Sequence, residues 1–165
     1  MPSDPIPQRD PETRESQSLA APTIELLKQN NSGSLSTFSV KHPEFPFASV
    51  ASYCMSPQNE PVFFFSSMAT HSKNLRSNPN AALLVTASQS ASALAGGRAT
   101  VMGTLIPVEE NIEEIRKAYL AANPDAAQWM SFGDFQFYRM EVVDIYFVAG
   151  FGVMGWIRPE EISSQ

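Results

Sequence analysis

The sequence is poor in residues that several classes of protein require. Cys54 is the single cysteine in 165 residues, so no intramolecular disulfide can form, and no cysteine and histidine cluster has zinc-site spacing. Lysine and arginine total 11 against 17 acidic residues, a net charge of −6, which argues against binding to a nucleic-acid backbone. No apolar run approaches the roughly 18 residues of a membrane span, and the N-terminus lacks a secretory signal pattern. These absences predict a cytoplasmic protein that binds neither nucleic acid nor membrane.

The length of the chain predicts one domain, because a fold of about 150 residues buries roughly 70% of the surface of its unfolded chain. Residues 1–18 contain four prolines and six charged side chains but hardly any apolar ones. Such a segment buries too little surface to offset the entropy lost on ordering. We therefore expect a flexible tail over 1–18 and a single folded domain over 19–165.

Short strands dominate the predicted domain. Runs rich in valine, phenylalanine, threonine and serine, separated by proline, asparagine and glycine, predict strands over 35–40, 45–55, 61–67, 81–88, 98–108, 135–142 and 143–150. Apolar spacing predicts helices over 21–30 and 111–124, and a helix of about two turns before Asn78 and Pro79. These helices are too few to cover a parallel sheet. The sequence thus predicts a mainly β (α+β) fold, an antiparallel barrel of about six strands with short peripheral helices.

Three glycines near the C-terminus match a dinucleotide-binding motif in spacing alone. Gly150, Gly152 and Gly155 form G-x-G-x-x-G after an apolar run, but only ten residues follow Gly155. A Rossmann unit needs a helix after the glycines, a second strand and an acidic residue about 20 positions further on. We therefore expect a tight turn in which glycine supplies a positive φ or a close backbone approach. The sequence leaves open whether the glycines serve only the turn or let a cofactor or a partner subunit pack closely against the backbone.

A polar segment follows the apolar run PVFFFSS, which is too apolar for a strand with one exposed face. Hydroxyl, imidazole, ammonium and amide groups lie here within nine residues, and a short helix begins among them. A helix start presents free N–H groups and a positive dipole, so this composition predicts a phosphate site. The alternative is an ordinary surface helix capped by Ser67 or Thr70. The donors of the segment are Ser66, Ser67, Thr70, His71, Lys73 and Asn74.

Four blocks occur in order between residues 34 and 157: FPFASVASY, PVFFFSSMATHSKNLRSNPNAALLV, RATVMGTLIPV and FGDFQFYRMEVVDIYFVAGFGVMGWI. Their most specific parts are the pattern S-x-x-A-x-H-x-x-N-L-x-x-N-P and the terminal D-F…G-F-G. Together they resemble the HugZ-type heme-utilisation proteins, a branch of the pyridoxamine 5'-phosphate oxidase-like FMN-binding split-barrel superfamily. The resemblance implies a six-stranded split barrel that pairs into a homodimer, with two equivalent cofactor sites at the interface.

The resemblance also implies a flavin site and hence a first hypothesis, an FMN-dependent oxidoreductase. Ser66 and the helix after it would hold the FMN phosphate, with Arg98 from a nearby strand. The backbone of 49–51 would run along the flavin ring, and Trp156 would cap the site or pack across the dimer. No residue declares itself as a catalytic acid or base. The implied cofactor-binding residues are Ser49, Val50, Ala51, Ser66, Ser67, Thr70, His71, Lys73, Arg98 and Trp156.

Departures from the family patterns define the alternatives. Pyridoxamine-phosphate oxidases have a lysine where His71 stands and an arginine-rich end where this chain has only Arg158, which argues against that substrate. HugZ proteins carry a heme-ligating histidine in a C-terminal extension, but no histidine follows His71 here. A heme-binding or heme-degrading protein would therefore use His71 or His42 as its iron ligand. A third hypothesis is a non-enzymatic barrel whose dimer face binds another protein. Cys54 is most simply a buried strand side chain, whereas Asp134 is left open between a strand cap and a site residue.

Overall fold

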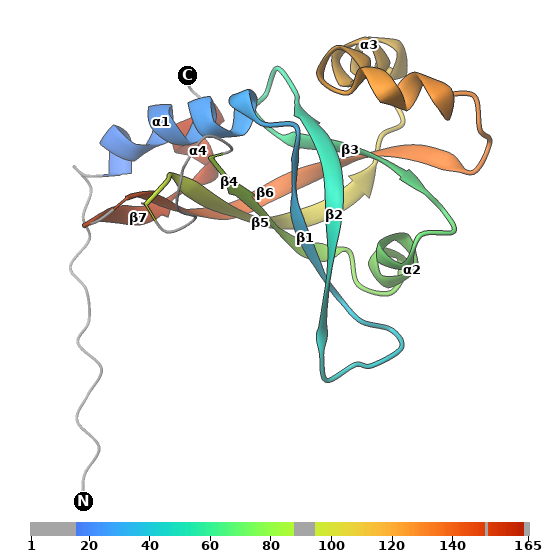
Figure 1. The fold of residues 1–165 in the computed structure, drawn as a ribbon, viewed down its shortest axis with the longest axis horizontal. Helices are drawn as coiled ribbons and strands as arrows, with labels where there is room; N and C mark the ends of the chain where they lie inside the picture. Colours follow the sequence, from blue (N-terminus) through green and yellow to red (C-terminus); the bar gives the residue numbers. More distant parts are fainter. Residues whose placement is uncertain (1–15, 88–94, 151, 164–165) are drawn as a thin grey trace, which may run out of the picture.

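The computed structural model describes residues 16–87, 95–150 and 152–163, with side chains described from residue 19. Residues 1–15 of the expected tail lie outside this part, and helix α1 begins at Ser16, so 16–18 are helical. The helices are α1 (Ser16–Gln29), α2 (Thr70–Ser77), α3 (Ile112–Ala122), the 3-10 helix η1 (Pro124–Gln128) and α4 (Pro159–Ser163). The strands are β1 (Ser32–Phe38), β2 (Pro46–Met55), β3 (Pro61–Ser66), β4 (Asn80–Thr86), β5 (Arg98–Pro107), β6 (Phe135–Gly150) and β7 (Val153–Ile157) (Figure 1).

Six antiparallel strands close into the predicted barrel. The strand order is β3-β2-β1-β4-β5-β6, and β3 also pairs with β6, which joins the two ends of the sheet. Strand β2 pairs with β3 only over Tyr53–Met55, so the barrel is split between the first part of β2 and the end of β3. Strand β6 is long enough for two neighbours on one edge, β3 along its first third and β7 along its last residues.

Alternating side chains fill the barrel and give it a second core outside. Leu35, Leu83, Val101 and Ile145 are fully buried inside, one from each of four successive strands. On β3, Phe63 and Phe65 face this interior, whereas Phe64 belongs to a second cluster with Cys54, Val62, Tyr119 and Phe137. Helix α3 packs on β2 and β3 over that second cluster. The strand PVFFFSS is thus buried on both faces, as its composition predicted.

Strand β6 differs from the sequence-based prediction, which divided it at 142 and 143. It is one strand with a β-bulge, because Met102 pairs with Asp144 while the next residue, Gly103, pairs with Val142. Val143 therefore has no partner on β5, and its side chain is 65% exposed. A bulge adds one residue to a strand and bends it, so the alternation of inward and outward side chains shifts by one position after it. The prediction of two separate strands divided the chain at this shift.

The glycine stretch joins two antiparallel strands, which excludes a Rossmann unit. Gly150 and Gly152 have φ values of +138° and +84°, as expected for a turn that favours glycine. Gly155 lies within β7, where an added Cβ would be 3.0 Å from Leu19 Cδ1 of α1. The prediction missed β7 as a strand.

Helices α2 and α3 confirm the predicted positions. Helix α2 has Ala69 at its N-cap and no side-chain cap hydrogen bond, so the prediction of Ser67 or Thr70 as cap is wrong. It packs on β1 and β2, while α1 packs on β7 and α4 across another part of the barrel (Figure 1). Within the described ranges, none of the helices is both long and apolar enough to cross a lipid bilayer.

Candidate functional site

The end of β3 is tied to the start of β6 by Asp134. Ser66 pairs with Phe135, and its hydroxyl donates a hydrogen bond of 2.6 Å to Asp134 Oδ2. The Ser67 N–H donates to the backbone oxygen of Asp134 at 2.7 Å, and the Met68 N–H donates to Ser66 Oγ at 3.1 Å. Asp134 therefore holds the two strands together, and its carboxylate occupies the start of the predicted phosphate site. A carboxylate so placed opposes a second anion.

His71 is the half-buried imidazole of the site. Its Nδ1 atom lies 3.2 Å from Ser49 Oγ on β2, and its ring packs on Phe65 with 4.3 Å between ring centroids. Burial lowers the pKa of His71, which favours the neutral ring. In the described part of the chain Nε2 has no hydrogen-bond partner, and it is not among the occluded polar atoms. A neutral imidazole with one nitrogen held and the other open is suited to bind a metal.

The other polar residues of the segment divide between the surface and the interior. Ser67, Thr70 and Lys73 are exposed around the start of α2. Asn74 instead is 2% exposed, donates to Thr37 Oγ1 at 2.9 Å and accepts from the Val40 N–H at 3.0 Å. Asn74, predicted as a phosphate donor, thus fixes α2 against β1 and thereby positions His71.

The predicted residues of β2 face different environments. Ala51 is buried, whereas Val50 points away from the barrel and is 79% exposed. Ser49 shares the strand face of Ala51 and contacts His71, so its side chain, and not only its backbone, belongs to the site. His42 lies exposed in the loop between β1 and β2, where its N–H donates to Ser39 Oγ at 3.0 Å.

Arg98 and Trp156 do not join these residues within one chain. Arg98 pairs with Val148 near the end of β6, most of a strand length from the Phe135 position that pairs with Ser66. Trp156 pairs with Tyr146, packs on its ring at a centroid distance of 5.0 Å and is 50% exposed. Within one chain, therefore, the predicted residues form two separate groups.

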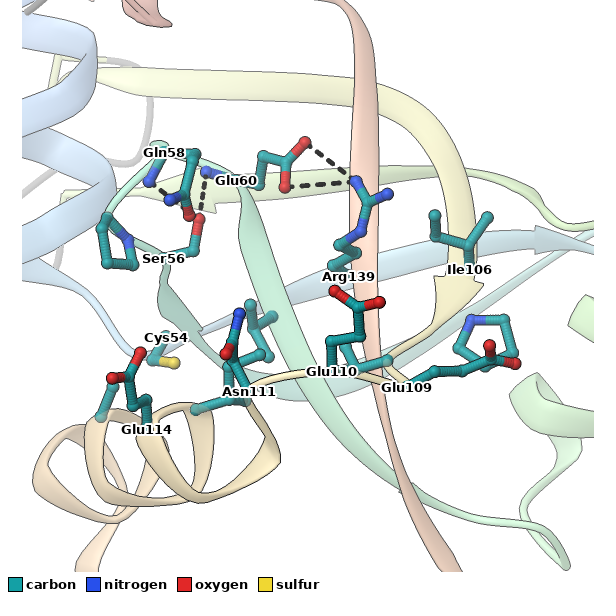
Figure 2. Close-up of a pocket in the computed structure, with 16 residues that line it drawn as sticks. Cys54, Ser56, Gln58, Glu60, Ile106, Glu109, Glu110, Asn111, Glu114 and Arg139 are labelled. Atoms are coloured by element: carbon teal, nitrogen blue, oxygen red, sulfur yellow. Dashed lines mark hydrogen bonds and ion pairs between the residues drawn. The ribbon is translucent and has the colours of Figure 1, made fainter.

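The cavities do not coincide with either group. The larger, about 670 Å³, is bounded by the β2–β3 hairpin, the end of β5 and helix α3 (Figure 2). The smaller, about 400 Å³, lies on β1, β4, β5 and β6 and includes Phe38 and Val143. None of the ten predicted cofactor residues lines either cavity. In the described residues, no group of three or more acidic, cysteine or histidine side chains is arranged to hold a metal ion.

Known proteins are similar to most of this chain. The family model described as CREG, beta-barrel matches residues 14–164. The protein named non-canonical heme oxygenase HOZ, chloroplastic, from Arabidopsis thaliana is 36% identical over 119 residues, which cover 72% of this chain and 36% of that protein. This chain therefore spans about a third of that relative's length.

Solved structures support the same grouping. A heme binding protein from Mycobacterium smegmatis has a TM-score of 0.75 and 26% identity, covering 95% of this chain and 62% of that chain. A putative pyridoxamine 5'-phosphate oxidase from Listeria innocua has a TM-score of 0.59 and 14% identity, covering 79% and 98%, a likeness of fold alone. The barrel, the order of the blocks and these relatives agree with the resemblance found in the sequence. The chain belongs to the CREG beta-barrel family, and it shares its fold with a putative pyridoxamine 5'-phosphate oxidase.

Proposed function

We propose that this protein binds heme in a homodimeric split barrel, with His71 as the imidazole ligand of the iron. The observation that carries the proposal is the geometry of His71, whose Nδ1 is held by Ser49 while Nε2 has no partner among the described residues. The heme-related names of the Arabidopsis and Mycobacterium relatives support it. They favour heme over the flavin-dependent oxidoreductase that the sequence alone suggested first.

Ser49 would set the tautomer that iron ligation needs. With Nδ1–H donating to Ser49 Oγ, the lone pair of Nε2 is available to a metal, as for metal-binding histidines generally. Packing on Phe65 restricts the ring, and burial lowers the pKa of His71, so the neutral ligand form is favoured. Bound heme would supply the iron for any redox chemistry. The residues described here would bind and orient it.

A row of uncharged residues on the outer face of the sheet supports the homodimer. One row of residues runs across six strands through Val50, Ser34, Leu84, Thr100, Tyr146 and Trp156. Val50, Leu84 and Trp156 on this row are at least 40% exposed. Exposed apolar side chains gathered on one face are typical of an interaction surface. Trp156 lies on this row and Arg98 lies two residues before Thr100 on β5, so pairing through this face would bring both side chains to the interface.

A hemin titration followed by absorption tests the ligand. We expect wild-type protein to give a saturable Soret band, and His71→Ala to change the band position and weaken binding roughly tenfold or more. The matched control is His42→Ala, which removes an exposed loop imidazole and leaves the spectrum unchanged. An unchanged spectrum in His71→Ala would overturn the assignment of the ligand.

The name of the Arabidopsis relative supports a further step, the oxidative opening of bound heme by dioxygen with electrons from an external reductant. Incubation of the hemin complex with ascorbate and catalase in air should then bleach the Soret band and release iron to a chelator. The same mixture without dioxygen should keep the band. Equal bleaching of free hemin under these conditions would contradict a role for the protein.

FMN is the second candidate, favoured by the exposed Ser67, Thr70 and Lys73 around the start of α2. Asp134 disfavours it, because its carboxylate already takes the Ser66 hydroxyl and stands where the phosphate would lie. Titration with FMN, with Lys73→Ala and Arg98→Ala as variants, separates the two cofactors. Micromolar FMN binding that both variants lose, without hemin binding, would replace our proposal. Binding of neither cofactor would favour the non-enzymatic interaction module instead.

A further inference from the structure

The smaller cavity, about 400 Å³, is an apolar pocket in the outer face of the sheet. Its rim carries two large apolar side chains that one protomer leaves exposed, Phe38 at 57% and Val143 at 65%. Smaller side chains, those of Ser36 on β1 and Ala82 on β4, also line it. No charged residue is among the described residues around the pocket. Exposed apolar side chains around a hollow are typical of a surface that another molecule covers.

The β-bulge of β6 places Val143 on this rim. Val143 is the extra residue between Val142 and Asp144, which pair with successive residues of β5. Bulges are common beside functional sites, where they redirect a side chain. Val143 belongs to neither core cluster of the described residues, so its side chain adds nothing to the barrel interior. Its position on the pocket therefore points to a role outside the barrel.

The pocket lies near the middle of one side of the sheet. Six strands follow one another there in the order β2-β1-β4-β5-β6-β7, and the inner four supply every lining residue except Pro46. The row from Val50 to Trp156 adjoins the pocket, since Ala82 of the pocket and Leu84 of the row are two positions apart on β4. A stable interface buries about 800 Å² of each partner, which a pocket of this size supplies only together with such a row. The pocket is therefore the centre of the face already proposed to pair.

We propose that the two-fold axis of the homodimer runs along the strands between β4 and β5, so that the pocket of one protomer faces the pocket of its partner. In a two-fold contact the same surface of both copies meets, and a residue close to the axis faces its own copy. A charged residue there would repel its copy, whereas this pocket is uncharged. The inference rests on the homodimer of the proposed function and adds the arrangement of its two subunits.

Such an axis brings β1 of one protomer opposite β6 of its partner, and β2 opposite β7. Phe38 then faces the partner's Val143, which closes the pocket from both sides. On the adjoining row, Val50 faces the partner's Trp156. Val50 follows Ser49, whose hydroxyl lies 3.2 Å from Nδ1 of the proposed iron ligand. The partner's Trp156 would therefore stand beside the heme site, and each subunit would contribute a residue to the site of the other.

Cross-linking between two different single-cysteine proteins tests this arrangement. Cys54→Ala first removes the single cysteine of the chain. Phe38→Cys and Val143→Cys are then made in separate proteins, which are mixed, allowed to exchange subunits and treated with a short bismaleimide. We expect a covalent dimer to form at least tenfold faster in the mixture than in either protein alone. The reason is that Phe38 faces the partner's Val143 and not its own copy.

A second mixture and a control extend the test. Proteins with Val50→Cys and Trp156→Cys should also form a covalent dimer faster when mixed than when separate. The matched control mixes Ile112→Cys with Phe132→Cys, two exposed apolar positions outside this face. The control mixture should give no covalent dimer at the same reagent concentration.

The outcomes separate the arrangement from the homodimer itself. Equal rates in the mixtures and in the separate proteins would mean a different axis and would overturn the proposal. The same conclusion follows if light scattering shows dimers but neither mixture forms a covalent product, and the homodimer would then stand. A wild-type protein that is monomeric by light scattering would contradict the homodimer and this arrangement together. The assignment of His71 as ligand is decided separately by the hemin titration.

Discussion

Replacement of Asn74 by alanine should destabilise the protein and displace the helix that carries His71. The side chain is 2% exposed and makes two hydrogen bonds, one to Thr37 Oγ1 on β1 and one from the Val40 N–H just after that strand. Each bond contributes about 1 kcal/mol, and the buried Thr37 hydroxyl would lose its donor at a further cost of about 1 kcal/mol. We expect a loss of about 2 to 3 kcal/mol in the free energy of unfolding. For a chain of this size that lowers Tm by roughly 4 to 12 °C.

An exposed pair of the same chemistry provides the control. Thr104 Oγ1 donates to Asn80 Oδ1 at 2.9 Å, the same distance as the bond between Asn74 and Thr37. Because this second pair is exposed, Asn80→Ala should change the free energy of unfolding by no more than about 0.5 kcal/mol. Urea unfolding of both variants, with Thr37→Val added for a double-mutant cycle, measures the difference. If Asn74→Ala costs no more than Asn80→Ala, the reasoning that Asn74 anchors α2 is wrong.

Three further predictions concern the bulge, the imidazole and the outer face. Gly103→Ala would place a Cβ 2.6 Å from Met140 Cγ and should cost about 1 to 3 kcal/mol in urea unfolding, whereas Gly133→Ala, with nothing within 4 Å, should be nearly neutral. Burial lowers the pKa of His71, so its contribution to stability is present above the ordinary pKa of about 6.5 and is lost as pH falls below it. His71→Asn should remove that part of the pH dependence measured by urea unfolding, and an unchanged slope would assign it elsewhere. Val50→Glu should halve the mass seen by light scattering without unfolding the chain, because Val50 is 79% exposed in one protomer. A dimer that survives would contradict the proposed interface.

The barrel could be predicted because its signals are local. The run Phe63, Phe64 and Phe65 is apolar at successive positions, and the structure buries all three, two inside the barrel and one beneath α3. Apolar residues recur at helical spacing along α3, and the structure buries Tyr119 on this helix. These patterns need no knowledge of distant contacts. The bulge at Val143, in contrast, can be recognised only from the pairing of β6 with β5. The local sequence is the same for one strand with an extra residue and for two separate strands.

The site could be predicted in composition but not in its contacts. His71 and the surrounding hydroxyls stood out as a cluster, yet the partner of His71 is Ser49, 22 residues earlier in the chain. Asp134 contacts Ser66 across 68 residues, and that contact exists only because β3 pairs with β6. Spacing within a segment cannot reveal a bond that depends on strand register. For this reason the role of Asn74 was predicted wrongly and the role of Asp134 was left open. Each residue nevertheless lies in a segment that the sequence analysis singled out.

The positions of Arg98 and Trp156 link cofactor binding to dimerisation. A family resemblance indicates which residues bind a cofactor, but it does not indicate whether one subunit or two supply them. Here the register separates Arg98 from Ser66 by most of the length of β6, so a site that uses both requires two protomers. Ser49 and His71, in contrast, meet within one chain. A monomeric Val50→Glu protein should therefore keep the imidazole ligand and its spectral signature but bind hemin more weakly than the dimer. Unchanged hemin affinity in that monomer would mean that one chain makes the whole site, and Trp156 would then have no part in it.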